Sequence, residues 1–239
     1  MSLIYTYSSS FSIHASLINF YKFRIMPILR SPTKLIMFCH IPKCGGSSIE
    51  NYCSKIGLEI AFFDQYYTAK PATQKWNISS PQHIDGESLL RLFPENFFDA
   101  YFTVVRNPVD RLKSAFIFHK YKAKSINKRY TLSTFIKKEL SANAMKYGFH
   151  DNHFLPQFKF LNEQCKHKIF KLEDGLSPVK RFIDDNMFGT ETDIEIDHVN
   201  QAKKTSKTSE EEVYLDEKAK KIITQIYEQD FIRFGYSIS

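Results

Sequence analysis

The stretch that decides the fold is LIMFCHIPKCGGSSIENYC, residues 35–53. Its first residues are mostly apolar and are bounded by prolines, which predicts a short buried strand over Leu35–His40. A helix is predicted from Ser47 to about Ile56, because serine favours a helix start and a glycine follows the helix. A turn containing one lysine, two glycines and two serines joins the strand to the helix.

This turn has the chemistry of a phosphate-binding loop. In parallel α/β folds, ligands lie at the carboxyl ends of strands. Glycine lets backbone N–H groups approach an anion, and a helix start adds free N–H groups and a positive dipole end. The candidate ligands are Lys43, Cys44, Gly45, Gly46, Ser47 and Ser48. The loop is not a Walker A motif, because its lysine precedes the glycines instead of following them.

A second strand–helix unit is YFTVVRNPVDRLKSAF, residues 101–116. Tyr101–Val105 is predicted to be a buried strand, and Asn107 is a good N-cap for the helix that follows. Arg106 ends the strand, and Ser114 lies about two turns along the helix. We expect these two side chains to hold a second phosphate, the first by its guanidinium and the second by its hydroxyl.

The rest of the chain continues the alternation of strands and helices. This order predicts a P-loop-like α/β fold of three layers, in which helices flank a mostly parallel central sheet. Residues 31–239 are expected to form one domain, and residues 1–30 to have no structural role. Further predictions are helices over Leu89–Phe93, Thr131–Leu140, Ala142–Tyr147 and Leu176–Asn186, a strand from Lys168, a polar linker over residues 200–210, and one long amphipathic helix over Glu211–Phe231.

Composition narrows the class of protein. The net charge of +7 favours anionic partners, such as nucleotides, sulfated or phosphorylated substrates, nucleic acid or a membrane surface. The four cysteines form no CxxC pair, so neither a zinc site nor a disulfide scaffold is predicted. No apolar run reaches the length of a membrane span. We expect a cytoplasmic protein, with the Golgi lumen as the alternative if the chain is a trimmed piece.

Taken together, HIPKCGGSSIE and FTVVRNPVDRLKSAF resemble the sulfotransferases that use 3′-phosphoadenosine 5′-phosphosulfate (PAPS), in the branch of the Golgi heparan and chondroitin O-sulfotransferases and their bacterial relatives. The resemblance extends to DNHFLPQFKFL (151–161), IFKLEDG (169–175) and IYEQDFIRFGY (226–236). It implies that the first motif holds the 5′-phosphosulfate and the second the 3′-phosphate. It also implies a product, 3′-phosphoadenosine 5′-phosphate (PAP), and no required metal. Cys44 departs from the family, which commonly has threonine or serine there, and its thiol is expected to have a lowered pKa.

Sulfuryl transfer to a hydroxyl needs a base and a cation at the leaving phosphate. Lys43 is the expected cation. His83 is the expected base, since the family carries its base histidine upstream of the second motif. His153 is the rival, in a segment that the resemblance places along the substrate cleft with Asn152 and Gln157. Arg111 is expected to point elsewhere, toward Asp110 or a surface carboxylate.

The acceptor implied by the resemblance is a hydroxylated molecule, most simply a carbohydrate. The basic segments Lys120–Arg129 and Lys203–Lys207 either attract an acidic saccharide or form solvated faces. A nucleotide kinase is disfavoured by the order of the loop, and a polyanion- or nucleic-acid-binding module by the scatter of the basic residues. A relative that binds nucleotide without catalysis is a further alternative. The sequence leaves the oligomeric state open.

Overall fold

The computed structural model describes residues 27–62, 64, 66–197 and 209–237. Its centre is a five-stranded sheet with the order β3-β1-β2-β4-β5. The strands are β1 (Ile28–Arg30), β2 (Leu35–Cys39), β3 (Glu59–Ala61), β4 (Ala100–Val105) and β5 (His167–Lys171). β2, β4 and β5 pair in parallel, and β1 is antiparallel to both β2 and β3. Four strands therefore point the same way, which confirms the mostly parallel sheet.

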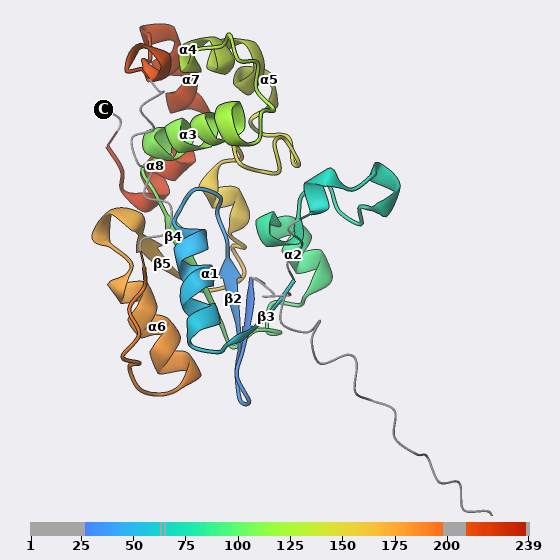
Figure 1. Cartoon of the computed structure of the whole chain (residues 1–239), viewed down its shortest axis with the longest axis vertical. Coiled ribbons are helices and arrows are strands. Elements are labelled where there is room, and N and C mark those ends of the chain that lie inside the picture. Colours follow the sequence, from blue (N-terminus) through green and yellow to red (C-terminus); the bar gives the residue numbers. More distant parts are fainter. Residues whose placement is uncertain (1–26, 63, 65, 198–208, 238–239) are drawn as a thin grey trace, which may run out of the picture.

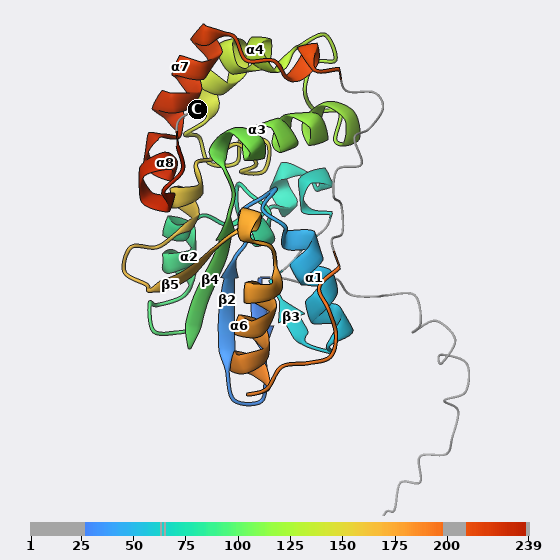
Figure 2. The same cartoon turned by 90° about the vertical axis from the view of Figure 1, so that its left-hand side faces the viewer.

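Helices cover both faces of this sheet (Figures 1 and 2). Side chains along β2 alternate between the faces, as the period of a strand requires. Ile36 and Phe38 join the core cluster formed with α1 (Gly46–Lys55) and α6 (Ser177–Met187). Met37 and Cys39 join the opposite cluster, which includes Leu89 of α2 (Gly86–Leu92). The predicted α/β/α layering is confirmed.

A helical layer lies beyond the carboxyl ends of the parallel strands, at the top of Figure 1. Its helices are α3 (Pro108–Ile117), α4 (Leu132–Phe135), α5 (Ser141–Asn143), α7 (Glu217–Ile226) and α8 (Glu228–Phe234). The layer shares one apolar core, to which α3, α4, α7 and α8 contribute. Two of the helices pass directly into five-residue π-helices, Phe118–Lys122 after α3 and Ile136–Leu140 after α4.

The predicted single helix over Glu211–Phe231 is wrong. A 3-10 turn over Glu211–Val213 comes first, and the helical segment then breaks between α7 and α8 at Tyr227. The buried Tyr227 hydroxyl donates to the Phe154 carbonyl at 2.8 Å, and the Asp230 carboxylate accepts from the backbone N–H groups of Gln157 and Phe158. These tertiary bonds fix the direction of α8.

The amino-terminal boundary also needs correction. β1 pairs with β2 through Ile28, Leu29 and Arg30, so the sheet begins within the segment that was expected to have no structural role. Leu29 is fully buried in the main core. Residues 1–26 and residues 198–208, which include most of the linker predicted over residues 200–210, lie outside the described residues.

Two further predictions of helices need small changes. The helix expected over Ala142–Tyr147 ends at Asn143, and turns follow it. The helix expected from Ser47 begins at Gly46, without a side-chain cap. Among the described residues, no helix combines the length and apolar character needed to cross a membrane.

Candidate active site

The loop between β2 and α1 has the backbone form of an anion-binding turn. Lys43 has φ 71° and Gly45 has φ 87°, both in the left-handed region, and α1 starts at the next residue. Left-handed residues in such a turn direct consecutive N–H groups to one side, where they can bind an anion. The start of α1 adds N–H groups that have no partner within the helix. The backbone therefore supports the phosphate-binding role predicted for this loop.

Gly46 is required for a reason that the sequence did not suggest. A Cβ atom at this position would lie 1.9 Å from Nε2 of His40. The His40 ring is buried, stacks on Phe38 with centroids 5.2 Å apart, and approaches Glu50 at 3.5 Å. Burial, with a smaller effect of His83, lowers its pKa well below the ordinary value, so the ring is neutral. The loop thus packs its first helical residue directly on a neutral histidine.

Arg106 follows β4 and contacts the first loop. Parallel pairing aligns Cys39 of β2 with Thr103 of β4, so the two strands end side by side. The Arg106 guanidinium donates to the Lys43 carbonyl at 3.4 Å. Asn107 caps α3 by accepting from the backbone N–H groups of Val109 and Asp110, as expected. The structure therefore brings the two predicted motifs together.

The serines of the two motifs differ in their placement. Ser47 is exposed on the first turn of α1, whereas Ser48 is buried. Ser114 is half-buried in the middle of α3. No hydrogen bond joins the Ser114 side chain to Arg106 in the described structure, so their joint grip on a phosphate remains a prediction.

Gln157 is the residue that joins the two motifs. It is fully buried, and its side-chain oxygen accepts from the Arg106 backbone N–H at 2.9 Å while its amide donates to the Arg106 carbonyl at 2.8 Å. The same oxygen accepts from the Cys44 thiol at 3.5 Å. Burial raises the pKa of that thiol to about 12, although Arg111 and Arg106 oppose the shift. The expected lowered pKa of Cys44 is therefore wrong, because its side chain points into the core.

Arg111 also differs from its prediction. Only 2% of the residue is exposed, and its guanidinium donates to three backbone carbonyls. The acceptors are Pro42 at 3.0 Å, Leu155 at 2.9 Å and His153 at 3.1 Å. Arg111 therefore fastens the first loop to the segment that carries His153. It makes no ion pair with Asp110 or another carboxylate of the described residues.

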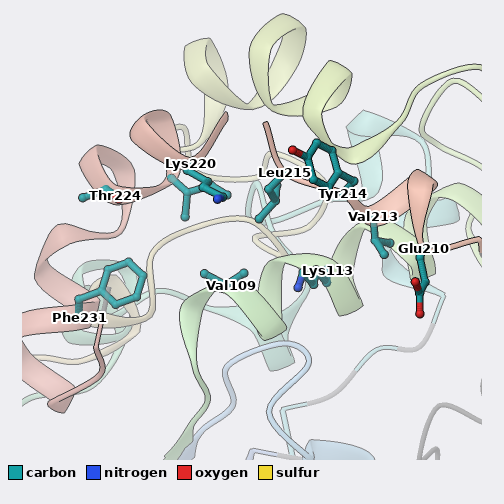
Figure 3. A pocket seen from close by; sticks show the side chains of 10 residues that line it. Val109, Lys113, Glu210, Val213, Tyr214, Leu215, Lys220, Thr224 and Phe231 are labelled. Atoms are coloured by element: carbon teal, nitrogen blue, oxygen red, sulfur yellow. The ribbon is translucent and has the colours of Figure 1, made fainter. Parts of the chain in front are cut away.

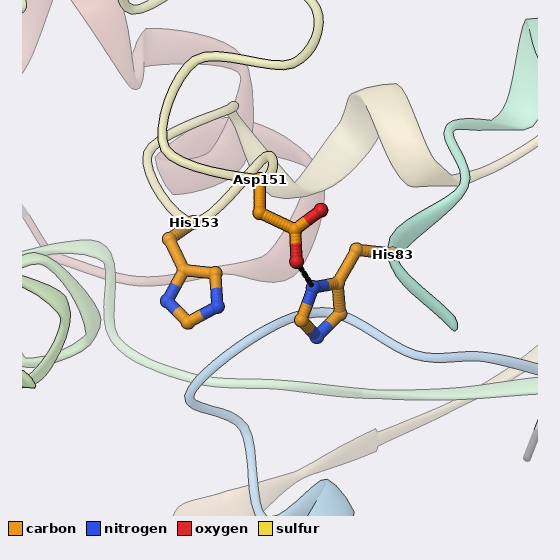
Figure 4. Close-up of side chains that lie close together, drawn as sticks. All are labelled: His83, Asp151 and His153. Carbon is orange, nitrogen blue, oxygen red and sulfur yellow. Dashed lines mark hydrogen bonds and ion pairs between the residues drawn. The ribbon is translucent and has the colours of Figure 1, made fainter. Parts of the chain in front are cut away.

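His83 is held by a carboxylate. Its Nδ1 lies 2.7 Å from Oδ2 of Asp151, and the two side chains face each other in Figure 4. Ser80 fixes the carboxylate by donating its N–H at 2.6 Å and its hydroxyl at 2.8 Å. Burial pushes the pKa of Asp151 upward, but His83 and the Ser80 hydrogen bonds outweigh it and lower the net pKa. Asp151 is therefore ionised and orients the His83 ring.

The backbone that carries Asp151 is unusual. Three consecutive non-glycine residues, His150, Asp151 and Asn152, have φ between 46° and 61°. Such residues cost about 1–3 kcal/mol each and occur mainly where the surroundings hold them. The Asn152 side chain provides this support, since it accepts from the Gly148 N–H at 2.7 Å and donates to the His83 carbonyl at 2.8 Å.

A row of histidine rings extends from His83 into the helical layer. His153 lies edge-on to His83 with centroids 5.0 Å apart, and His119 lies 4.5 Å from His153. Burial lowers the pKa of His119 to about 3 and that of His153 well below its ordinary value. Both rings are neutral as a result, and Nδ1 of His153 has no hydrogen-bond partner in the described part of the chain.

Lys43 reaches the same row from the phosphate loop. Its Nζ lies 4.6 Å from the centroid of the Phe118 ring, which stacks on His153 at 5.1 Å. Burial lowers the pKa of Lys43 to about 8, and the charges of Lys122 and Arg106 act in the same direction. The contacts from Lys43 through Phe118 and His153 to His83 place the expected cation and the expected base in one site.

A separate pocket of about 470 Å³ lies between α3, α7 and α8 (Figure 3). Val109 and Lys113 of α3 line one side of it, and Leu215, Ile223 and Phe231 line the other. None of the residues predicted to bind PAPS or to act as base lines this pocket. Lys113 therefore provides a cation on the same helix as Ser114 but outside the site.

Sequence reasoning missed the roles of three residues that build the site, although it named Arg111 and Gln157. Asp151 and Gln157 lie in the DNHFLPQ segment, and Arg111 lies within the second motif. A buried amide or guanidinium is recognised only when its partners are known, and those partners lie 42 to 69 residues away in the sequence. Of the three, Asp151 would have been the easiest to predict from the sequence, because it lies two residues before the candidate histidine His153 and an aspartate often pairs with a catalytic histidine.

The comparisons with known proteins identify the family of the chain. The model of the sulfotransferase family, family 2, matches residues 26–237, which is nearly the whole chain and all of its sheet. No curated protein and no solved structure matches the chain. The match confirms the expected family and the expected enzyme class. The chain therefore belongs to the sulfotransferase family and is a PAPS-dependent sulfotransferase.

Proposed function

We propose that this enzyme transfers the sulfuryl group of PAPS to a hydroxyl group of a carbohydrate, with His83 as the base and Lys43 as the cation at the leaving phosphate. The observation that carries the proposal is the continuous contact from Lys43 through Phe118 and His153 to the His83–Asp151 pair. A cation and an oriented base at one site are the two groups that the reaction needs.

The transfer step follows from the orientation of His83. In the neutral His83 ring, donation from Nδ1 to Asp151 leaves the other ring nitrogen, Nε2, without a proton, so Nε2 can take one from the acceptor hydroxyl. The hydroxyl oxygen forms a bond to sulfur while the bond from sulfur to the bridging oxygen breaks. The electron pair of the broken bond remains on the 5′-phosphate of PAP, whose added negative charge Lys43 stabilises.

The two motifs would divide the nucleotide between them. The loop of Lys43, Gly45 and Gly46 would hold the 5′-phosphosulfate by its backbone N–H groups, with Ser47 and Ser48 at the helix start. Cys44 would contribute only its backbone, because its side chain is buried against Gln157. Arg106 and Ser114 would hold the 3′-phosphate, as the resemblance to the family implies.

The structure favours His83 over His153 as the base. His83 has a carboxylate partner that stabilises the imidazolium formed during transfer. His153 has none, and burial lowers its pKa well below the ordinary value of a histidine, with smaller effects of His83, His119 and Lys43 in the same direction. A base with such a low pKa takes up a proton poorly. His153 instead packs between Phe118 and His83 and keeps both rings in place.

An acidic carbohydrate fits the charge around the site. Four basic residues are exposed beyond α3: Lys122 at the end of the π-helix, and Lys124, Lys128 and Arg129 on the loop that follows it. Lys122 lies 5.7 Å from the Phe118 centroid, beside the row of rings that leads to His83. Lys120 does not belong to this group, because it is buried and paired with Glu212. Lys203–Lys207 lie outside the described residues.

Calorimetric titration with PAP in metal-free buffer tests the nucleotide site, with ATP as the comparison ligand. We expect PAP to bind much more tightly than ATP. Arg106→Ala should weaken PAP binding by roughly 10- to 150-fold, since a hydrogen bond to a charged group contributes about 1.5–3 kcal/mol. The matched control is Lys113→Ala, which removes a cation of the separate pocket and should leave PAP affinity unchanged. A folded protein that does not bind PAP would overturn the proposal.

A screen of acceptors with labelled PAPS is needed to test the catalytic roles of His83 and His153. On any acceptor found, His83→Ala should abolish most turnover and leave the Kd of PAP intact, whereas His153→Ala should retain more activity than His83→Ala. The reverse order of the two variants would assign the base to His153. Neutral and acidic saccharides in the screen test the acceptor class.

A further inference from the structure

Three side chains of the site could bind a metal ion together. The potential ligand atoms of His83, Asp151 and His153 all lie within 4.8 Å of one another. In Figure 4 a ring nitrogen of His153 faces the His83–Asp151 pair. His153 is buried, and the side chains of His83 and Asp151 are only 12% and 13% exposed. We propose that these three residues form a binding site for Zn²⁺. The reaction does not require this ion, and the bound ion would block the reaction.

The type and number of ligands favour zinc. Two imidazole nitrogens and one carboxylate oxygen, with a fourth position left to solvent, are a common zinc set. Mg²⁺ prefers six oxygen ligands and would bind poorly here. Tetrahedral zinc with bonds of about 2.0–2.2 Å places its ligand atoms roughly 3.4 Å apart. Nδ1 of His83 and Oδ2 of Asp151 are 2.7 Å apart, so they would separate by about 0.7 Å to admit the ion, while the His153 ring would move inward.

The surroundings support these ligands. Ser80 donates two hydrogen bonds to the Asp151 carboxylate and fixes its orientation. The backbone carbonyls of His83 and His153 accept from Asn152 and Arg111, at 2.8 and 3.1 Å. Bonds of this outer kind orient metal ligands and contribute to their affinity. In contrast, Nδ1 of the His153 side chain has no partner in the described structure, so no bond at this atom opposes movement of the ring.

Occupation by zinc would compete with the base. The ion would take the place of the proton between His83 Nδ1 and Asp151, so the pair could no longer present His83 to a hydroxyl. The neighbouring charges of Lys43 and Arg111 oppose a cation at this position, as their effect on His153 shows. A bound polyanion offsets such charges, so PAP and Zn²⁺ should each raise the affinity of the other by the same factor.

Zinc binding can be measured without any acceptor, so its outcome is independent of the proposed reaction. The experiment is a calorimetric titration of tag-free, chelator-treated protein with ZnCl₂, with and without PAP. We expect one Zn²⁺ per chain and no comparable binding of MgCl₂. His153→Gln and Asp151→Asn should each weaken zinc binding at least tenfold. His167→Gln is the matched control, because His167 is a half-buried histidine of β5 outside the cluster.

Two controls keep the outcome clear. PAP binding and thermal unfolding show whether each variant is folded. If His153→Gln or Asp151→Asn does not fold, His83→Gln takes its place. Co²⁺ in place of Zn²⁺ should show the absorption of a tetrahedral site that His153→Gln removes. Absence of stoichiometric zinc binding would overturn the inference, and so would binding that the folded ligand variants leave unchanged. Failure of PAP binding with intact zinc binding would count only against the proposed function.

Discussion

Gly46 is the position where one added methyl group should have the largest effect on the phosphate loop. In Gly46→Ala the new Cβ would lie 1.9 Å from Nε2 of His40 and 2.5 Å from two of its ring carbons. Ordinary Cβ contacts begin near 3.4 Å, so the ring would have to move by about 1.5 Å. His40 is confined by Phe38 and by His83, at centroid distances of 5.2 and 5.1 Å. We expect the substitution to lower the free energy of unfolding by about 1–3 kcal/mol, as other overpacked cores do.

The same substitution should have the opposite sign when His40 is absent. In His40→Ala the space beside Gly46 is open, and alanine is favoured over glycine in a helix by up to about 1 kcal/mol. Gly46→Ala should therefore be neutral or stabilising in that background. The coupling between the two positions is expected to be roughly 1–4 kcal/mol, well above the error of a double-mutant cycle.

The assay is urea unfolding of the four proteins, followed by far-UV circular dichroism. Equal slopes with urea would show that the variants differ in stability and not in the compactness of the unfolded state. PAP affinity, measured in parallel, should fall in Gly46→Ala, since the displaced ring and loop no longer fit the phosphate. The reasoning fails if Gly46→Ala is harmless in the wild-type background, or if its cost is the same with and without His40.

Three further predictions concern the groups of the site. Asp151→Asn should lower kcat by roughly 10- to 150-fold, because a hydrogen bond to a charged group contributes about 1.5–3 kcal/mol, while the Kd of PAP stays unchanged; an equal loss in PAP binding would show that Asp151 acts on the fold instead. The affinity for PAP should decline as the pH rises through about 8, because Lys43 then loses the charge that attracts phosphate; just below pH 8 this charge is present and its contribution to the affinity is retained. Lys122→Ala removes a charge that lowers this pKa, so the decline should move to higher pH in a calorimetric pH series; an unmoved midpoint would exclude Lys43 as its source. Native protein should react with a thiol reagent first at Cys165, since Cys39, Cys44 and Cys53 are buried and burial raises their pKa values; rapid modification of Cys44, located by mass spectrometry, would contradict its placement in the core.

Prediction of secondary structure from the sequence was wrong where short or interrupted elements depend on partners far away in the chain. β1 and β3 contain three residues each, too few to show a period. β1 becomes a strand because β2 offers an edge to pair with, and β3 because β1 does. The break at Tyr227 carries no proline or glycine signal. It arises because the buried Asp230 carboxylate must meet the N–H groups of Gln157 and Phe158, some 70 residues earlier in the chain.

The site likewise combines residues that the sequence could identify with partners that only the fold brings together. The expected histidine base was named from its segment, but its carboxylate partner was not, since Ser80, His83 and Asp151 meet only through the fold. The lowered pKa expected for the Cys44 thiol followed from its neighbours in sequence. It was wrong because the direction of the side chain, and therefore its burial, is decided by Gln157 and the core.

What the sequence by itself determined is the two strand–loop–helix units, the layered α/β class and the family, because each motif is contiguous and its local chemistry is complete within some 16 to 19 residues. Only the tertiary structure decided that Lys43, Phe118, His153, His83 and Asp151 form one site, and that Arg111 and Gln157 hold its two halves together. The physical reason is burial. A ring, a guanidinium or an amide has its role set by the partners that replace water around it, and those partners come from segments that only the fold brings into contact.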